Sequence, residues 1–188
     1  NDLGKSHSTI PLLLGYAQLQ AFYLYKYHEA IQTINEILLM PQLKGHDKAK
    51  AKILLADVNL LTGEIWEASL LYSQVEKEFK YDIWGEDAKF KNAKISYYTG
   101  NFKWAKAQLD VLKGSTSKLI ANDALELSLL ITDNTTLDTN TLPLFIFAQT
   151  DLLIYQNKFD EALLKYDTLL TAFPSHSLND EIIYRKAQ

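Results

Sequence analysis

Apolar residues recur three and four positions apart along most of the chain, which is the spacing that places side chains on one face of an α-helix. The pattern begins with Leu12, Tyr16 and Leu19 and stops wherever glycine or proline interrupts it. It predicts four helical hairpins, one single helix and the start of a last helix. They span residues 10–40, 48–79, 86–112 and 142–173 for the hairpins, 118–132 for the single helix and 177–188 for the last one.

The breaks in this pattern predict the turns. Thr62-Gly63 and Thr99-Gly100 divide two of the hairpins, because glycine adopts the left-handed conformation that ends a helix at little cost. Residues 156–158 divide the last hairpin. The segment 132–141 contains five threonines and four Asx residues, so we expect it to be a loop.

Four segments repeat one motif, in which a large apolar residue precedes an alanine by three positions. They are residues 27–30, 65–68, 102–105 and 159–162, and their alanines lie 38, 37 and 57 positions apart. A period of about 35 residues is typical of stacked helical hairpins. The longer last interval is explained by the helix at 118–132 and its loop. The sequence therefore predicts one all-α domain over 1–188, a right-handed superhelical solenoid with an extra inserted helix.

Composition narrows the class of protein. A net charge of −4 and a pI near 5.6 argue against a nucleic-acid partner, which requires a basic surface. The longest apolar run, residues 10–17, is too short for a transmembrane segment. Because the chain starts at Asn1 without methionine and stops within a helical pattern, we expect it to be a fragment of a longer protein.

Motifs for catalysis are absent from the sequence. It has no cysteine, no Gly-rich phosphate loop and no G-x-S-x-G or H-E-x-x-H motif. Each of its four histidines lacks a second ligand at zinc spacing, so they are interpreted as surface residues. We therefore expect no enzymatic activity, no cofactor and no bound metal.

The repeated motif resembles that of the tetratricopeptide repeat (TPR) family. Ala30, Ala68, Ala105 and Ala162 match the small residue of the second helix, and apolar residues follow each of them four and seven positions later. In the first helices the small residue is kept as Ala56 and Ala93 but replaced by Gln18 and Thr150. The long repeats and the Phe173-Pro174 ending look like bacterial cell-envelope TPR proteins. That resemblance implies a periplasmic or outer-membrane-associated scaffold.

In TPR proteins the first helix of each hairpin lines a concave surface that binds a protein or peptide partner. The resemblance therefore implies a partner-binding surface with five aromatic residues, to which tyrosine contributes large contact area and a hydroxyl group. The matching residues are Leu19, Phe22 and Tyr23, then Asp57, Leu60 and Leu61, then Lys94, Tyr97 and Tyr98, and last Asp151, Ile154 and Tyr155.

Three alternatives stay open on the sequence alone. The aromatic stripe is equally compatible with packing between hairpins, because apolar residues at helical spacing usually form a core. Aromatic faces beside Asp or Asn also suit a module that binds carbohydrate or another small ligand. A third interpretation is a structural spacer inside a longer array of repeats. The sequence does not indicate the oligomeric state.

Overall fold

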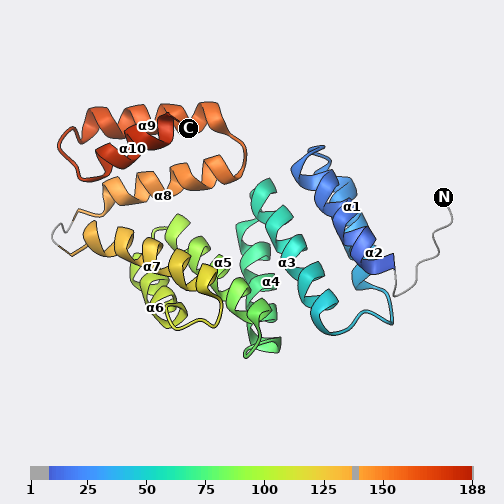
Figure 1. Ribbon diagram of the computed structural model, residues 1–188. Coiled ribbons are helices and arrows are strands. Elements are labelled where there is room, and N and C mark those ends of the chain that lie inside the picture. Colours follow the sequence, from blue (N-terminus) through green and yellow to red (C-terminus); the bar gives the residue numbers. More distant parts are fainter. Residues whose placement is uncertain (1–8, 137–139, 188) are drawn as a thin grey trace. The chain divides into compact units, whose positions relative to one another are not determined.

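The computed structural model describes residues 9–136 and 140–187, and within these ranges the chain forms helices and no strands (Figure 1). Helices lie in each of the six predicted helical regions, with ends that differ by a few residues. The helices are α1 (Ile10–Phe22), α2 (Tyr27–Leu38), α3 (Gly45–Thr62), α4 (Ile65–Glu78), α5 (Ile83–Tyr98), α6 (Phe102–Leu112), α7 (Lys118–Asp133), α8 (Leu142–Tyr155), α9 (Phe159–Ala172) and α10 (Leu178–Lys186).

The chain divides into two compact units, Asn1–Lys89 and Phe90–Gln188, with the boundary inside α5. In the first unit α1 packs on α2, α3 packs on both of them, and α4 packs on α3. Ile34 and Ile37 of α2 form the core of this unit together with Ala51, Leu55 and Val58 of α3. The packing of each helix on its neighbours in the chain agrees with a hairpin repeat.

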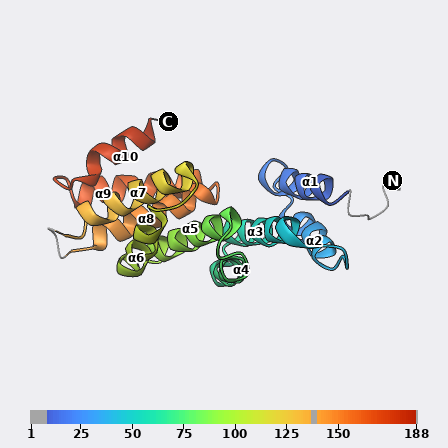
Figure 2. The same cartoon turned by 60° about the horizontal axis from the view of Figure 1, so that its bottom comes forward.

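In the second unit α6 packs on α7, α8 on α9, and α9 on α10 (Figure 2). Phe147 of α8 and Tyr166 of α9 are buried side by side, with ring centroids 5.9 Å apart. Ser117 caps α7 by accepting a hydrogen bond from the Ile120 amide at 3.4 Å. Part of the predicted 132–141 loop, residues 137–139, lies outside the described residues.

The turns inside the four hairpins share one backbone conformation. Each contains a residue with positive φ: Tyr25 at 56°, Gly63 at 95°, Gly100 at 79° and Asn157 at 58°. The next residue has φ between −92° and −80° and ψ between 61° and 67° in all four cases. Glycine and asparagine tolerate positive φ best, which explains three of these four residue choices.

The four repeated alanines occupy equivalent positions. Each lies three residues after the start of its helix, and each is buried: Ala30, Ala68 and Ala105 are fully buried and Ala162 is 2% exposed. The apolar residues four and seven positions later are at most 3% exposed in every hairpin. Because a buried alanine lets two helix backbones approach closely, the motif sets the helix contacts of each hairpin.

The first hairpin differs by one residue in its turn. The amide of Lys26 donates to the carbonyl oxygen of Gln20, six residues back, whereas the equivalent bond in the other hairpins reaches five residues back. Ala17, not Gln18, therefore takes the small-residue position. Ala17 is fully buried, as are Ala56, Ala93 and Thr150, whereas Gln18 is exposed. The sequence alignment of this helix was wrong by one position.

Two features of the fold bear on function. Among residues 9–136 and 140–187, no helix combines the length and apolarity needed to cross a membrane. Helix α10 is short, but it packs on α9 and ends with Arg185 and Lys186. The single-domain organisation and the right-handed superhelix remain predictions.

Candidate functional site

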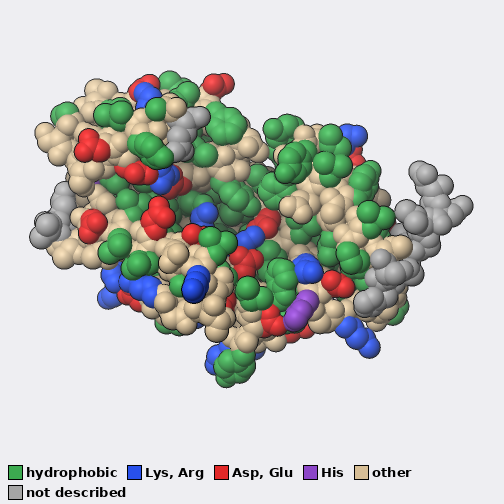
Figure 3. All heavy atoms as spheres, in the orientation of Figure 1, with side chains coloured by type: hydrophobic (Ala, Val, Ile, Leu, Met, Phe, Trp, Pro, Cys, Tyr) green, Lys and Arg blue, Asp and Glu red, His purple; other side chains and the backbone are tan. Residues whose placement is uncertain are grey.

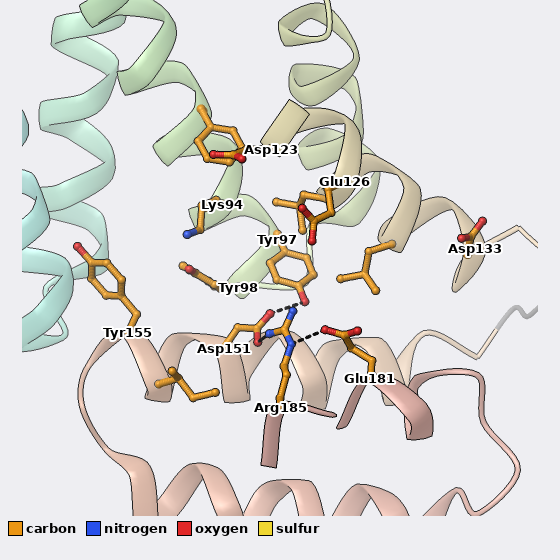
Figure 4. Close-up of a pocket in the computed structure, with 14 residues that line it drawn as sticks. Lys94, Tyr97, Tyr98, Asp123, Glu126, Asp133, Asp151, Tyr155, Glu181 and Arg185 are labelled. Carbon is orange, nitrogen blue, oxygen red and sulfur yellow. Dashed lines mark hydrogen bonds and ion pairs between the residues drawn. The ribbon is translucent and has the colours of Figure 1, made fainter. Parts of the chain in front are cut away.

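The second unit contains a groove of about 610 Å³ between α5, α7, α8 and α10 (Figure 4). Its walls combine aromatic and aliphatic side chains with carboxylates and two cations. All the residues that line the groove belong to the unit Phe90–Gln188. The volume of the groove lies in the range that is typical of ligand pockets.

Two walls of the groove come from predicted residues. Helix α5 contributes Lys94, Tyr97 and Tyr98, and α8 contributes Asp151, Ile154 and Tyr155. These six residues are the complete predicted sets of the third and fourth hairpins, at matching positions seven to eleven residues before the repeated alanine. The hairpin geometry therefore brings both sets to one groove.

A chain of polar contacts crosses the floor of the groove. The hydroxyl of Tyr97 donates a hydrogen bond to Asp151 Oδ2 at 2.9 Å, and Arg185 Nη1 pairs with Asp151 Oδ1. Arg185 Nε also donates to Glu181 Oε1 at 2.7 Å, one turn earlier on α10. The guanidinium carbon lies 4.7 Å from the centre of the Phe147 ring, a cation–π contact. Figure 4 shows Tyr97, Asp151, Arg185 and Glu181 converging from three helices.

Burial raises the pKa of Asp151, Tyr97 and Tyr98. Desolvation raises the pKa of Asp151 to about 6, although Arg185 and the Tyr97 hydroxyl act in the opposite direction. Desolvation also raises the pKa of Tyr97 and Tyr98 well above the ordinary tyrosine value. Both tyrosines are therefore neutral at physiological pH. Because Tyr97 keeps its proton, it remains a hydrogen-bond donor to the Asp151 carboxylate.

The wall formed by α7 was not predicted as part of the site. Asp123, Glu126 and Asp133 line the groove together with Leu127 and Leu130. Steps of three or four residues from 123 to 126, 130 and 133 place them on one helix face, so the sequence carried a signal. It was missed because α7 was assigned only a packing role as the inserted helix.

Helix α10 was also missed as a wall. Glu181 and Arg185 are one helical turn apart, a spacing that favours an ion pair on a single helix. The sequence does not indicate that this pair meets Asp151, which lies 34 residues from Arg185 in the chain.

The predicted residues of the first unit do not line this groove. Leu19 and Tyr23 are 45% and 70% exposed, because the longer turn moves them one position away from the repeat register. The positions equivalent to those of the other hairpins are held by Gln18, Ala21 and Phe22. Phe22 is partly buried and packs against the core. Asp57 accepts a hydrogen bond from the Tyr72 hydroxyl at 2.5 Å.

The aromatic residues of the groove are less open than expected. Tyr97 is 1% exposed and Tyr98 is 4% exposed, while Tyr155 is half-buried. Tyr97 packs against Tyr98 and Phe102, with ring centroids 5.7 and 6.0 Å away. The expectation of a surface lined by open tyrosine rings is therefore corrected: Tyr97 and Tyr98 form the floor, and the accessible walls combine charged and aliphatic side chains with the half-buried rings of Phe90 and Tyr155.

The lining of the groove is predominantly acidic. Its five carboxylates outnumber its two cations, Lys94 and Arg185. In the part of the chain that the structure describes, no three His, Cys, Asp or Glu side chains are grouped so that they could hold a metal ion.

Comparisons with family models and with curated proteins gave no match.

Proposed function

We propose that this chain is a TPR-like repeat scaffold that carries out no reaction and binds a segment of a partner protein in the groove of its second unit. The observation that supports this proposal most directly is the convergence of Lys94, Tyr97 and Tyr98 with Asp151, Ile154 and Tyr155. A repeat scaffold would use equivalent positions of successive hairpins in this way.

The groove suits an extended peptide better than a sugar. Carbohydrate binding commonly relies on an exposed aromatic face on which the sugar ring stacks. Tyr97 and Tyr98 are almost fully buried, and the other two aromatic rings of the groove, Phe90 and Tyr155, are half-buried. A peptide can use the remaining features, which are Leu127, Leu130 and Ile154 for its apolar side chains and the charged groups for its polar ones.

A library of displayed peptides selected against the immobilised chain tests this proposal. Selected peptides, labelled with a fluorophore, should lose about tenfold in affinity when Ile154 and Tyr155 are replaced by alanine, which corresponds to about 1.4 kcal/mol. Both side chains are only half-buried, so the fold should survive. Tyr97 is unsuitable for this test, because truncating a buried aromatic residue costs about 3–5 kcal/mol.

Tyr184→Ala is the matched control, since Tyr184 is 63% exposed on α10 and does not line the groove. Its affinity for the selected peptides should equal that of the wild type. Failure to select any peptide, or equal binding by wild type and the Ile154→Ala/Tyr155→Ala variant, would contradict the proposal.

We also propose a cell-envelope location, which rests on the resemblance of the repeats to envelope TPR proteins. Fractionation of the native cells, with an antibody against the chain, tests it. Recovery in the cytoplasmic fraction would exclude this location.

A second candidate function, that of a spacer in a repeat array, is favoured by one observation. Leu12, Tyr16 and Leu19 form an exposed face of α1, 59%, 52% and 45% exposed. Hydrophobic side chains gather over α1 in Figure 3. Their equivalents in α3 are Ala51, Leu55 and Val58, which are buried against the preceding hairpin. By repeat equivalence, a further helical hairpin would cover this face of α1.

A further inference from the structure

We propose that the partner segment bound in the groove presents lysine or arginine side chains, which the carboxylates of α7 bind. This inference rests on the proposed function and adds the chemical class of the partner. It concerns Asp123, Glu126 and Asp133 together with the apolar residues between them. The groove, and not the carboxylates alone, defines the site.

The α7 carboxylates are available to a ligand. Within residues 9–136 and 140–187, the carboxylates of Asp123, Glu126 and Asp133 accept no hydrogen bond and form no ion pair. The two cations of the groove are differently placed: Arg185 already contacts Asp151 and Glu181, and Lys94 lies 5.8 Å from the ring centre of Tyr98. The groove therefore has an excess of negative charge on the α7 wall.

The floor of the groove already shows how a cation is held here. Arg185 enters from α10, pairs with two carboxylates and lies over the Phe147 ring. The two carboxylates and the face of the ring replace the hydration that the guanidinium loses on burial. A basic side chain of a partner would find comparable chemistry on α7, where Leu127 and Leu130 can contact its methylene groups.

The length of the α7 wall sets the length of the segment. From Asp123 to Asp133 the helix rises about 15 Å, at about 1.5 Å per residue. An extended peptide covers this distance with about five residues, at about 3.3 Å each. Alternate side chains of such a peptide point to the same side, so a segment with basic residues at alternate positions would face α7 with all of them.

Charge excludes the opposite class of partner. Phosphate groups and acidic peptides would meet the carboxylates of Asp123, Glu126 and Asp133 in a partly desolvated groove, where like-charge contacts are strongly unfavourable. Electrostatic attraction also predicts that binding of a basic segment weakens as salt is added, because the α7 carboxylates are partly exposed to solvent.

Three fluorescent pentapeptides test this inference by fluorescence anisotropy: Lys-Leu-Lys-Leu-Lys, the same peptide with Gln for Lys, and the same peptide with Glu for Lys. We expect the lysine peptide to bind at least tenfold more tightly than the glutamine peptide in 50 mM salt. The glutamate peptide should not bind. Raising the salt to 500 mM should remove most of the difference.

The variant Asp123→Asn/Glu126→Gln removes two carboxylates from the groove with almost no change of shape, and it should weaken binding of the lysine peptide at least tenfold. Asp160→Asn/Glu161→Gln is the matched control. It changes the net charge equally, on the exposed start of α9 and away from the groove, and should alter the affinity less than twofold. Circular dichroism verifies that both variants remain folded.

The outcomes separate this inference from the proposed function. If the glutamine peptide binds as tightly as the lysine peptide, and Ile154→Ala/Tyr155→Ala weakens both, the groove binds peptides but the basic partner is excluded. If both double amide variants lose affinity equally, the lysine peptide responds to net charge alone and the inference fails. Absence of binding by all three peptides overturns the inference, while the library selection decides the proposed function.

Discussion

At the scale of single residues, Asp151 combines burial, an ion pair and a raised pKa. Its carboxylate is 14% exposed and contacts Arg185 and Tyr97. A buried carboxylate gains from these contacts but loses its hydration, and here the loss is larger, since the pKa rises from 3.8 to about 6. Lys94 favours the ionised form of Asp151, and Glu181 opposes it.

This shift predicts a pH dependence of stability. The folded chain keeps the Asp151 proton to higher pH than the unfolded chain. The stabilisation of the folded state that results is therefore complete below about pH 4. It is lost as the pH rises through about 6. Asp151→Asn cannot ionise. The wild type should therefore lose stability relative to this variant between pH 4 and pH 7, by at most about 3 kcal/mol.

Urea unfolding of both proteins at pH 4, 5, 6 and 7 measures this difference. Asp160→Asn, on the exposed surface of α9, controls for the loss of one carboxylate. A wild type that gains stability over Asp151→Asn as the pH rises would show that the ion pair with Arg185 outweighs burial.

At the scale of elements, the turns inside the hairpins set the helix contacts. Positive φ recurs in all four turns, and only two of the four positions hold glycine. Gly63 has open space around it, whereas a Cβ at Gly100 would lie 2.8 Å from Phe145 Cδ2 of α8. The turn between α5 and α6 is therefore restricted by both its backbone and its neighbour.

Alanine substitutions at these two glycines should differ in cost. Gly63→Ala should destabilise its hairpin by about 1–2 kcal/mol, the cost of a left-handed conformation for an L-residue. Gly100→Ala should cost at least about 1 kcal/mol more, because Phe145 must also move. Hydrogen exchange of the helices on either side of each turn measures both effects. Equal costs would show that Phe145 moves freely.

At the scale of the whole molecule, the chain forms two units with a core in each. The exposed face of α1 in the first unit gives a further expectation, because Leu12, Tyr16 and Leu19 are equivalent to buried residues of α3. In the absence of another hairpin, we expect a second copy of the chain to cover this face at high concentration.

Light scattering after size-exclusion chromatography tests this expectation. The wild type should gain mass as its concentration rises, and Leu12→Lys/Tyr16→Lys should stay monomeric. Leu39→Lys/Leu70→Lys changes two other exposed leucines, 82% and 61% exposed, and should associate like the wild type. A wild type that is monomeric at every concentration would contradict the expectation.

The sequence predicted the helices well because their signals are local. Three of the four hairpin turns contain glycine or asparagine, which favour the end of a helix, and each repeated alanine lies at the same distance from the turn before it. Tyr25 shows where such signals fail: it adopts positive φ without being glycine or asparagine, and the one-residue shift of α1 went unnoticed. The candidate site was predicted in part, through the repeat positions on α5 and α8.

The sequence by itself determined the all-helical class, the hairpin boundaries and the burial of the four alanines, since these depend on spacing along one or two adjacent helices. Only the tertiary structure decided that Tyr97 and Tyr98 are buried while Tyr23 is exposed, and that Arg185 reaches Asp151. Helical periodicity shows that side chains share a face. Whether that face meets water, a neighbouring helix or an opposite charge depends on residues far away in the chain.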